Sequence, residues 1–122
     1  MRTCLVVDDS SVVRKVARRI FEVLDFDARE AQGAHEALGQ CQEAMPDAIL
    51  VDGHLSAMST TEFLSTLRMM TDGNKPVVLF CTSENDNGEI ARALTAGADD
   101  YVLKPFDRES IRSKLAAAGM KL

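Results

Sequence analysis

The sequence has 122 residues, of which 46% are hydrophobic and 27% are charged, and its formal net charge is −5. This length suits one compact domain that buries enough surface to fold without a disulfide or a structural metal. No apolar run reaches the ~20 residues of a membrane span, and an acidic chain without a basic cluster is not expected to bind DNA or RNA. The three cysteines are widely spaced, which favours buried thiols in a reducing compartment and therefore a cytoplasmic location.

Short apolar runs alternate with helical periods along the whole chain. The apolar runs predict five strands, at residues 5–7, 26–31, 48–51, 77–81 and 101–103. The periodic segments predict five helices, at residues 11–24, 34–45, 59–70, 90–96 and from 108 to the end.

Single residues indicate how these helices begin, end and face. In the first helix, Val12 and Val16 are predicted to lie on the apolar stripe and Arg14 off it. Ser59 precedes the third helix in a Ser-x-x-Glu capping-box spacing, and Gly97 predicts a left-handed cap after the fourth.

Strict alternation of strands and helices predicts an α/β fold. The central strands are apolar throughout, as expected for a parallel sheet that is covered on both faces. With right-handed crossovers, the chain is predicted to form a doubly wound, flavodoxin-like domain of five strands in the order 2-1-3-4-5 with five helices.

Polar residues with related chemistry follow four of the predicted strands. Parallel strands end at the same edge of a sheet, which is where ligands bind in such folds. The residues expected at that edge are Asp8, Asp9, Asp52, Thr82, Ser83 and Lys104.

Three carboxylates at one edge repel each other, by several kcal/mol for each close pair at an effective dielectric constant of ~20. A hard divalent cation relieves this repulsion, and all-oxygen ligands favour Mg²⁺. Lys104 and the metal together neutralise the three acids, so an incoming phosphoryl group meets the metal, Lys104 and the Thr82 hydroxyl. Asp52 is then a nucleophile that forms an aspartyl phosphate.

Each residue also has a purely structural interpretation. Asp8 and Asp9 suit a helix N-cap, Asp52 a turn, Thr82 the start of a loop, and Lys104 a solvated surface position. Their shared place at strand ends favours the functional interpretation.

These residues also carry a family resemblance. The chain resembles, over essentially its whole length, the receiver domains of bacterial two-component response regulators, in particular the single-domain chemotaxis regulators. The likeness is carried by residues 5–10, the strand that ends in Asp52, residues 81–84 and residues 97–106.

The resemblance implies a role for each acid. Asp52 is expected to be the phosphoacceptor, supplied by a phosphohistidine of a sensor histidine kinase or a phosphotransfer protein. Asp9, Asp52 and the backbone carbonyl of His54 are expected to bind Mg²⁺ directly, and Asp8 is expected to act through metal-bound water. His54 and Glu84 fall at the two variable positions that tune dephosphorylation.

The resemblance also implies a switch. Thr82 and Lys104 are expected to contact the phosphoryl oxygens, and the Lys104–Pro105 bond is expected to be cis. Tyr101 is expected to swing inward when Thr82 moves toward the phosphate. The partner-binding face is expected to include Tyr101, Ile90 and Lys114.

One loop departs from the family pattern. The usual Met-Pro and Met-Asp-Gly are absent after Asp52, and Thr60 stands where the family has a glycine. We expect Ser59 to compensate by capping the next helix, and Gly53 to leave the loop more mobile.

Residues 1–122 are therefore predicted to form one receiver domain without an attached output domain. Its partner is expected to be a downstream protein such as a flagellar motor switch, with phosphorelay, cell-cycle or phosphate-sink roles as alternatives. The domain is not expected to be an enzyme beyond its own phosphorylation and dephosphorylation.

Two other functional classes fit less well. A Mg²⁺-dependent phosphatase with an aspartyl-phosphate intermediate needs Asp-x-Asp and a cap insertion, for which the chain has no room. A flavodoxin-like cofactor binder needs a Ser-, Thr- and Gly-rich loop after the first strand, where Asp8 and Asp9 would repel a phosphate.

Overall fold

A computed structural model describes residues 1–83 and 85–122. The strands are β1 (Arg2–Val7), β2 (Phe26–Ala31), β3 (Ala48–Asp52), β4 (Val77–Thr82) and β5 (Asp100–Leu103). The helices are α1 (Ser11–Val23), α2 (Ala34–Glu43), α3 (Thr60–Met69), α4 (Asn87–Ala96) and α5 (Arg108–Ala117). All ten predicted elements are present, and α5 ends before the terminus instead of running to it.

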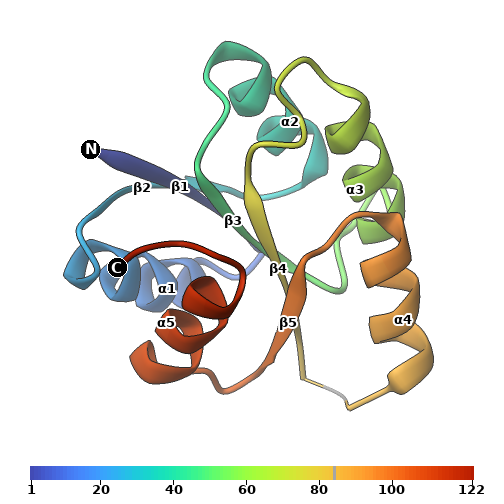
Figure 1. Cartoon of the computed structure of the whole chain (residues 1–122). Helices are drawn as coiled ribbons and strands as arrows, with labels where there is room; N and C mark the ends of the chain where they lie inside the picture. The colour runs from blue at the N-terminus through green and yellow to red at the C-terminus, as the bar shows by residue number, and fades with distance from the viewer. Residues whose placement is uncertain (84) are drawn as a thin grey trace.

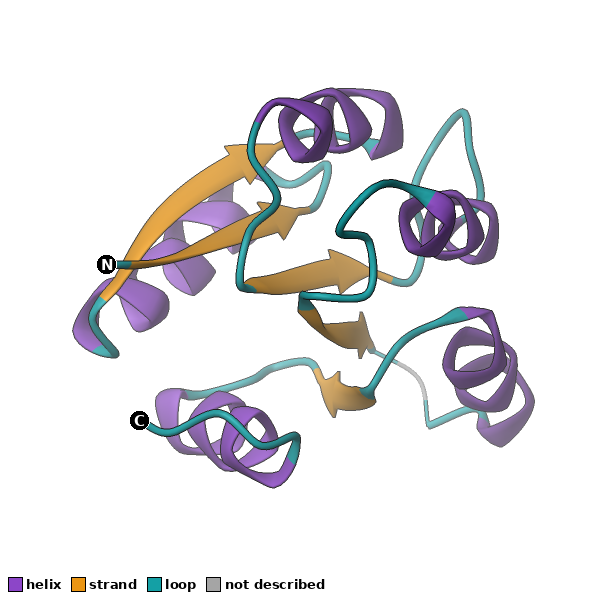
Figure 2. Ribbon diagram, turned by 45° about the horizontal axis from the view of Figure 1, so that its top comes forward, coloured by secondary structure: helices purple, strands orange, loops and turns teal. Residues whose placement is uncertain are grey.

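The five strands form one sheet in the order β2-β1-β3-β4-β5, and every neighbouring pair is parallel. The predicted flavodoxin-like order is thereby confirmed. Helices α1 and α5 cover one face, and α2, α3 and α4 cover the other (Figure 1). The sheet twists between these two helical layers (Figure 2).

Each face of the sheet has its own hydrophobic core. On the α1/α5 side the ring of the fully buried Phe21 packs edge-on against that of Phe26 at a centroid distance of 5.3 Å. On the other side Phe63 and Phe80 are buried with aliphatic residues of α2, α3 and α4. The predicted edge strand β2 alternates buried and exposed residues over most of its length, as expected for a strand with one face in water.

Helix α1 differs from the predicted stripe. Arg14, predicted to lie off the buried face, is buried, whereas Val12 and Val16 are 69% and 49% exposed. Arg14 is buried because the guanidinium is satisfied there: Nε bonds Glu30 at 2.9 Å and Nη1 donates to the Asp8 carbonyl at 2.8 Å. Hydrophobic periodicity cannot predict the burial of a charged side chain whose hydrogen-bond partners come from other parts of the fold.

The helix ends follow the sequence more closely. The Ser10 hydroxyl caps α1 by accepting the Val13 N–H, and Ser59 caps α3 by accepting the Glu62 N–H. Gly97 follows α4 with φ of 138°, in the region that favours glycine.

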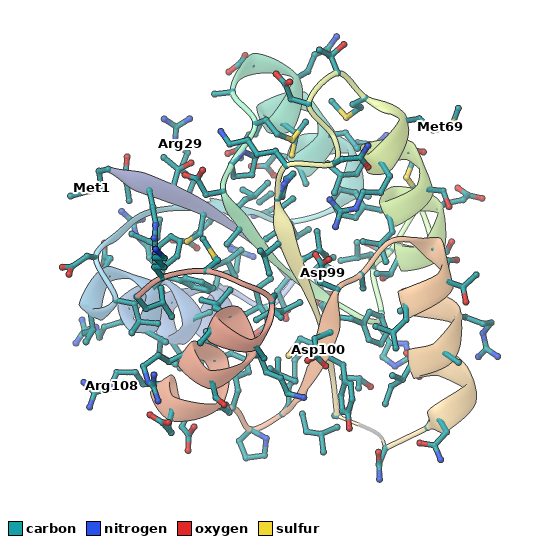
Figure 3. All side chains as sticks on the ribbon, viewed as in Figure 1. Met1, Arg29, Met69, Asp99, Asp100 and Arg108 are labelled. Carbon is teal, nitrogen blue, oxygen red and sulfur yellow. The ribbon has the colours of Figure 1, made fainter. Side chains whose placement is uncertain are left out.

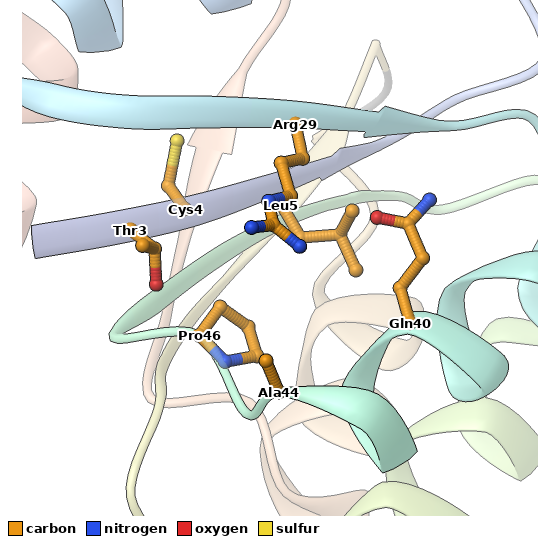
Figure 4. A pocket seen from close by; sticks show the side chains of 7 residues that line it. All are labelled: Thr3, Cys4, Leu5, Arg29, Gln40, Ala44 and Pro46. Carbon is orange, nitrogen blue, oxygen red and sulfur yellow. The ribbon is translucent and has the colours of Figure 1, made fainter.

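The two edges of the sheet differ in character. The amino-end region holds a small pocket of about 30 Å³ between β1, β2 and α2 (Figure 4). Residues of the acid cluster do not line it. At the carboxyl edge the polar strand ends converge.

None of the helices in the described residues is long and apolar enough to cross a membrane.

Candidate phosphorylation site

Three carboxylates meet at the carboxyl edge of the sheet. Asp8 and Asp9 follow β1, and Asp52 ends β3, the neighbouring strand. Each contributes one oxygen, and these three atoms lie within 4.8 Å of one another. Asp8 and Asp52 are buried, at 3% and 7% exposure, whereas Asp9 is exposed. The predicted acid cluster is therefore present, and it is open to solvent on the side of Asp9.

Lys104 places an ammonium inside this cluster. Its Nζ lies 2.9 Å from Asp52 Oδ1 and 3.1 Å from Asp8 Oδ2, although Lys104 is 52 and 96 residues away in sequence. Burial lowers the pKa of Lys104, but hydrogen bonds to Asp52 and Asp8 outweigh burial and raise that pKa above its usual value. The lysine is therefore charged at neutral pH, and the cluster holds three acids against one cation.

The backbone around Asp8 is held by side chains and by a neighbouring strand. Its N–H donates to the Ala31 carbonyl at 3.1 Å, and its Oδ1 accepts the Ser10 N–H at 2.9 Å. The Asp8 carbonyl accepts from the buried Arg14, whose charge is balanced by Glu30. Sequence reasoning missed Arg14 and Glu30, because they are 16 residues apart and lie on separate elements.

Thr82 is fully buried at the end of β4, with the exposed Ser83 next to it. The Thr82 carbonyl accepts the backbone N–H of Lys104 at 2.8 Å, so the ends of β4 and β5 are joined beside the acids. The Lys104–Pro105 bond is cis, as predicted. The structure thus brings Thr82 and Lys104 together with the acid cluster.

The irregular loop after Asp52 is anchored to the sheet and to α3. The Gly53 N–H donates to the Cys81 carbonyl at 2.8 Å, and the Thr60 hydroxyl donates to the Asp52 carbonyl at 2.8 Å. The sequence marks Thr60 as a departure from the family pattern, but its contact with Asp52 was not foreseen. A hydroxyl at a position usually held by glycine is the signal that points to it.

A further acid lies beside this loop. His54 is exposed, and its Nε2 lies 3.7 Å from Glu89 Oε1 of α4. A Cβ added at Gly53 would lie 2.9 Å from the same Glu89 oxygen. Glu89 was not among the predicted site residues, because nothing in the sequence indicates that α4 brings it close to the loop after Asp52. The predicted tuning residue Glu84 lies outside the described residues.

Comparison with known proteins decides the family. The model of the response regulator receiver domain matches residues 4–116. The chain belongs to the response regulator receiver domain family. The resemblance read from the sequence is therefore confirmed.

This receiver domain is similar to a transcriptional regulatory protein and to a chemotaxis response regulator. It is 30% identical over 116 residues to the phosphate regulon transcriptional regulatory protein PhoB of Escherichia coli K12. The matched region covers 95% of this chain and 51% of PhoB. The chain thus spans about half the length of that curated relative. The chemotaxis response regulator CheY4 of Vibrio cholerae superposes with a TM-score of 0.89 at 26% identity, over 97% of this chain and 98% of CheY4.

A third comparison shows the same fold in another context. The receiver domain of the sensor histidine kinase PA1611 from Pseudomonas aeruginosa PAO1 superposes with a TM-score of 0.86 at 23% identity, over 98% of each chain. That structure has a magnesium ion coordinated in its active-site cleft. Receiver domains are signalling domains that accept a phosphoryl group on an aspartate and bind Mg²⁺ at an acidic pocket.

The residues predicted for the partner face come from α4, β5 and α5. Lys114 Nζ lies 4.5 Å from the centroid of the Tyr101 ring and 3.1 Å from Asp100 Oδ1. Asp100 is the first residue of β5 (Figure 3). Both Tyr101 and Lys114 are partly exposed. Ile90 of α4, also predicted for this face, is 7% exposed and packs in the core, because it lies on the α4 stripe that faces the sheet.

Proposed function

We propose that Asp52 is the phosphoacceptor of this receiver domain. The observation that carries the proposal is the position of its carboxylate: buried at the end of a central strand, paired with Lys104 at 2.9 Å, and grouped with Asp8 and Asp9. Asp9 is exposed, and the Asp8 carboxylate accepts the Ser10 N–H in addition to the Lys104 ammonium that it shares with Asp52, so Asp52 is the acid best placed to act as nucleophile.

The donor set fits Mg²⁺. All three side chains offer oxygen, the ligand that hard divalent cations prefer, and the cluster carries a net charge of −2 after Lys104 is counted. Asp9, Asp52 and the backbone carbonyl of His54 would hold the ion, with Asp8 acting through a metal-bound water. When bound, the ion supplies positive charge that offsets the negative charge of the phosphoryl group.

The chain's own residues then account for the transfer. An Asp52 carboxylate oxygen attacks phosphorus, a P–O bond forms, and the bond between phosphorus and the donor's imidazole nitrogen breaks with the electron pair going to that nitrogen. Lys104 moves its ammonium from the carboxylates to a phosphoryl oxygen, and the Thr82 hydroxyl contacts another. Positioning and charge stabilisation supply most of the catalysis in such transfers.

The signal is proposed to leave through the α4–β5–α5 face. Tyr101 and Lys114 lie on that face, and the shared end of β4 and β5 joins it to Thr82 and Lys104. The phosphodonor is a histidine kinase or a phosphotransfer protein. Likeness to CheY4 favours a chemotaxis or motility target such as a flagellar motor switch, whereas likeness to PhoB favours no particular output for this chain.

We place this signalling in the cytoplasm, with no enzymatic activity on other substrates. The three cysteines are free and buried, as expected in a reducing compartment. His54 and Glu84 are proposed to set the lifetime of the phosphorylated state.

Phosphorylation by a small-molecule donor tests the assignment. The protein is incubated with phosphoramidate and Mg²⁺, and its intact mass is measured with and without chelator. We expect one phosphoryl group per chain, stable to acid and labile to base, which is absent in Asp52→Asn. Asp27→Asn, an exposed acid on β2, serves as the matched control and should label like the wild type. Equal labelling of Asp52→Asn would remove Asp52 from the role.

A further inference from the structure

The loop of residues 53–59 that joins β3 to α3 contains no proline, so no fixed φ angle stiffens it and its conformation depends on other contacts. Two of its apolar side chains, Leu55 and Met58, pack against the core. The Met58 N–H donates to the Ser56 carbonyl at 2.8 Å, and Ala57 has a positive φ of 69°. These contacts order the loop between residues 55 and 58.

At the base of the loop, the backbone is held through the peptide group that joins Asp52 to Gly53. The C=O of Asp52 and the N–H of Gly53 belong to the same planar unit. Its N–H donates to the Cys81 carbonyl of β4 at 2.8 Å, and its C=O accepts the Thr60 hydroxyl of α3 at 2.8 Å. One peptide plane is therefore fixed from both sides, by the neighbouring strand and by the following helix.

The Thr60 contact is well shielded from water. Thr60 is 4% exposed and Asp52 is 7% exposed, so water cannot easily replace the hydroxyl as donor. Thr60 is also the first residue of α3, and the cap at Ser59 fixes where that helix begins. The hydroxyl thus ties the end of β3 to a rigid element and closes the loop of residues 53–59 between them.

We propose that Thr60 is a positioning residue for the phosphoacceptor. By fixing the peptide plane after Asp52, its hydroxyl sets the direction of the Asp52 carboxylate and of the His54 carbonyl two residues later, which are two of the proposed metal ligands. The inference rests on the proposed role of Asp52. It assigns to a side-chain hydroxyl the rigidity that the missing proline does not supply.

Two substitutions separate the hydroxyl from the volume of the side chain. Thr60→Val removes the hydroxyl at nearly constant shape, and Thr60→Ser keeps it without the methyl group. Thr66→Val makes the same chemical change at an exposed position of α3 and serves as the control. All variants are measured well below their melting temperatures, so that loss of folded protein does not enter the result.

Three readouts are compared. In Thr60→Val we expect faster hydrogen exchange of the Gly53 amide in the metal-free protein, about fivefold weaker Mg²⁺ binding by calorimetry, and slower labelling by phosphoramidate. Removing a side chain that hydrogen-bonds a metal-ligating group typically weakens metal binding ~10–100-fold. We expect a smaller loss of Mg²⁺ affinity here, because Thr60 bonds the backbone of Asp52 and not its carboxylate. Thr60→Ser should stay within about twofold of the wild type, as expected for a retained hydrogen bond.

The results distinguish the two proposals. If Thr60→Val matches Thr66→Val in Mg²⁺ affinity and amide exchange, or if Thr60→Ser loses as much as Thr60→Val, the hydroxyl does not position Asp52. If instead the wild type accepts no phosphoryl group, the proposed function fails, and the exchange and calorimetric data still report whether Thr60 orders the acid site.

Discussion

Lys104→Met offers a direct test of the electrostatics of the acid cluster. In the wild type the ammonium lies 2.9 Å from an Asp52 oxygen and 3.1 Å from an Asp8 oxygen. At an effective dielectric constant of ~20, each contact has a Coulomb energy of about 5 kcal/mol before dehydration is subtracted. The substitution removes both contacts and leaves two buried carboxylates and a nearby third without a cation.

The magnitude follows from burial. Removing one partner of a fully buried ion pair costs about 3–5 kcal/mol. The Lys104 side chain is 24% exposed, so water compensates for part of the loss, and we expect the free energy of unfolding without Mg²⁺ to fall by about 2–3 kcal/mol. For a chain of 122 residues this lowers the melting temperature by about 10 °C.

The same substitution should strengthen Mg²⁺ binding. The ammonium and the cation compete for the same oxygens, and removing the ammonium changes the charge of the cluster from −2 to −3. A unit charge ~5 Å from a divalent ion contributes about 1.5 kcal/mol even at the dielectric constant of water, which corresponds to about tenfold in affinity. Mg²⁺ should therefore restore most of the stability that the variant has lost.

Thermal unfolding with and without Mg²⁺, together with calorimetric titration, measures both effects. Lys75→Met is the control, because Lys75 carries the same charge but is 53% exposed and pairs with Asp47 at 3.5 Å, away from the cluster. A Lys104→Met protein as stable as Lys75→Met without Mg²⁺, or one that binds Mg²⁺ no tighter than the wild type, would refute the reasoning.

Three further predictions concern packing, a buried charge and the thiols. Gly53→Ala places a Cβ 2.9 Å from Phe80 Cζ and should cost about 1–3 kcal/mol in chemical denaturation, whereas Gly39→Ala, in open space on α2, should be neutral or stabilising. Arg14→Met leaves Glu30 without its buried partner and should cost about 2–3 kcal/mol, against less than about 1 kcal/mol for the half-exposed Arg18→Met. Burial raises the pKa of Cys4 and Cys81 to about 12 and that of Cys41 to about 11, from 9.0. A raised folded-state pKa gives stability that is complete below the unfolded value and lost above it, so denaturant titrations should show a loss of about 1 kcal/mol per thiol between pH 9 and 10. A stability that stays flat over that interval would contradict burial of the thiols.

Much of the fold was predictable because its signals are local. The apolar runs at β3 and β4, the cap at Ser59 and the glycine at Gly97 each act within a few residues, and all were placed correctly. Arg14 was misplaced because its burial depends on Glu30 and on the Asp8 carbonyl, which hydrophobic periodicity does not represent.

The sequence by itself determined the kind of site: acids, a hydroxyl and a lysine at the ends of parallel strands are brought to one edge by the topology alone. Only the tertiary structure decided how they interact. It paired Lys104 with Asp8 and Asp52 together, buried Arg14 behind Asp8, and joined Thr60 to the Asp52 carbonyl. These contacts depend on distances of a few ångströms between separate elements, because hydrogen bonds and ion pairs weaken steeply with distance and angle. Strand order sets which residues meet, and packing sets which atoms do.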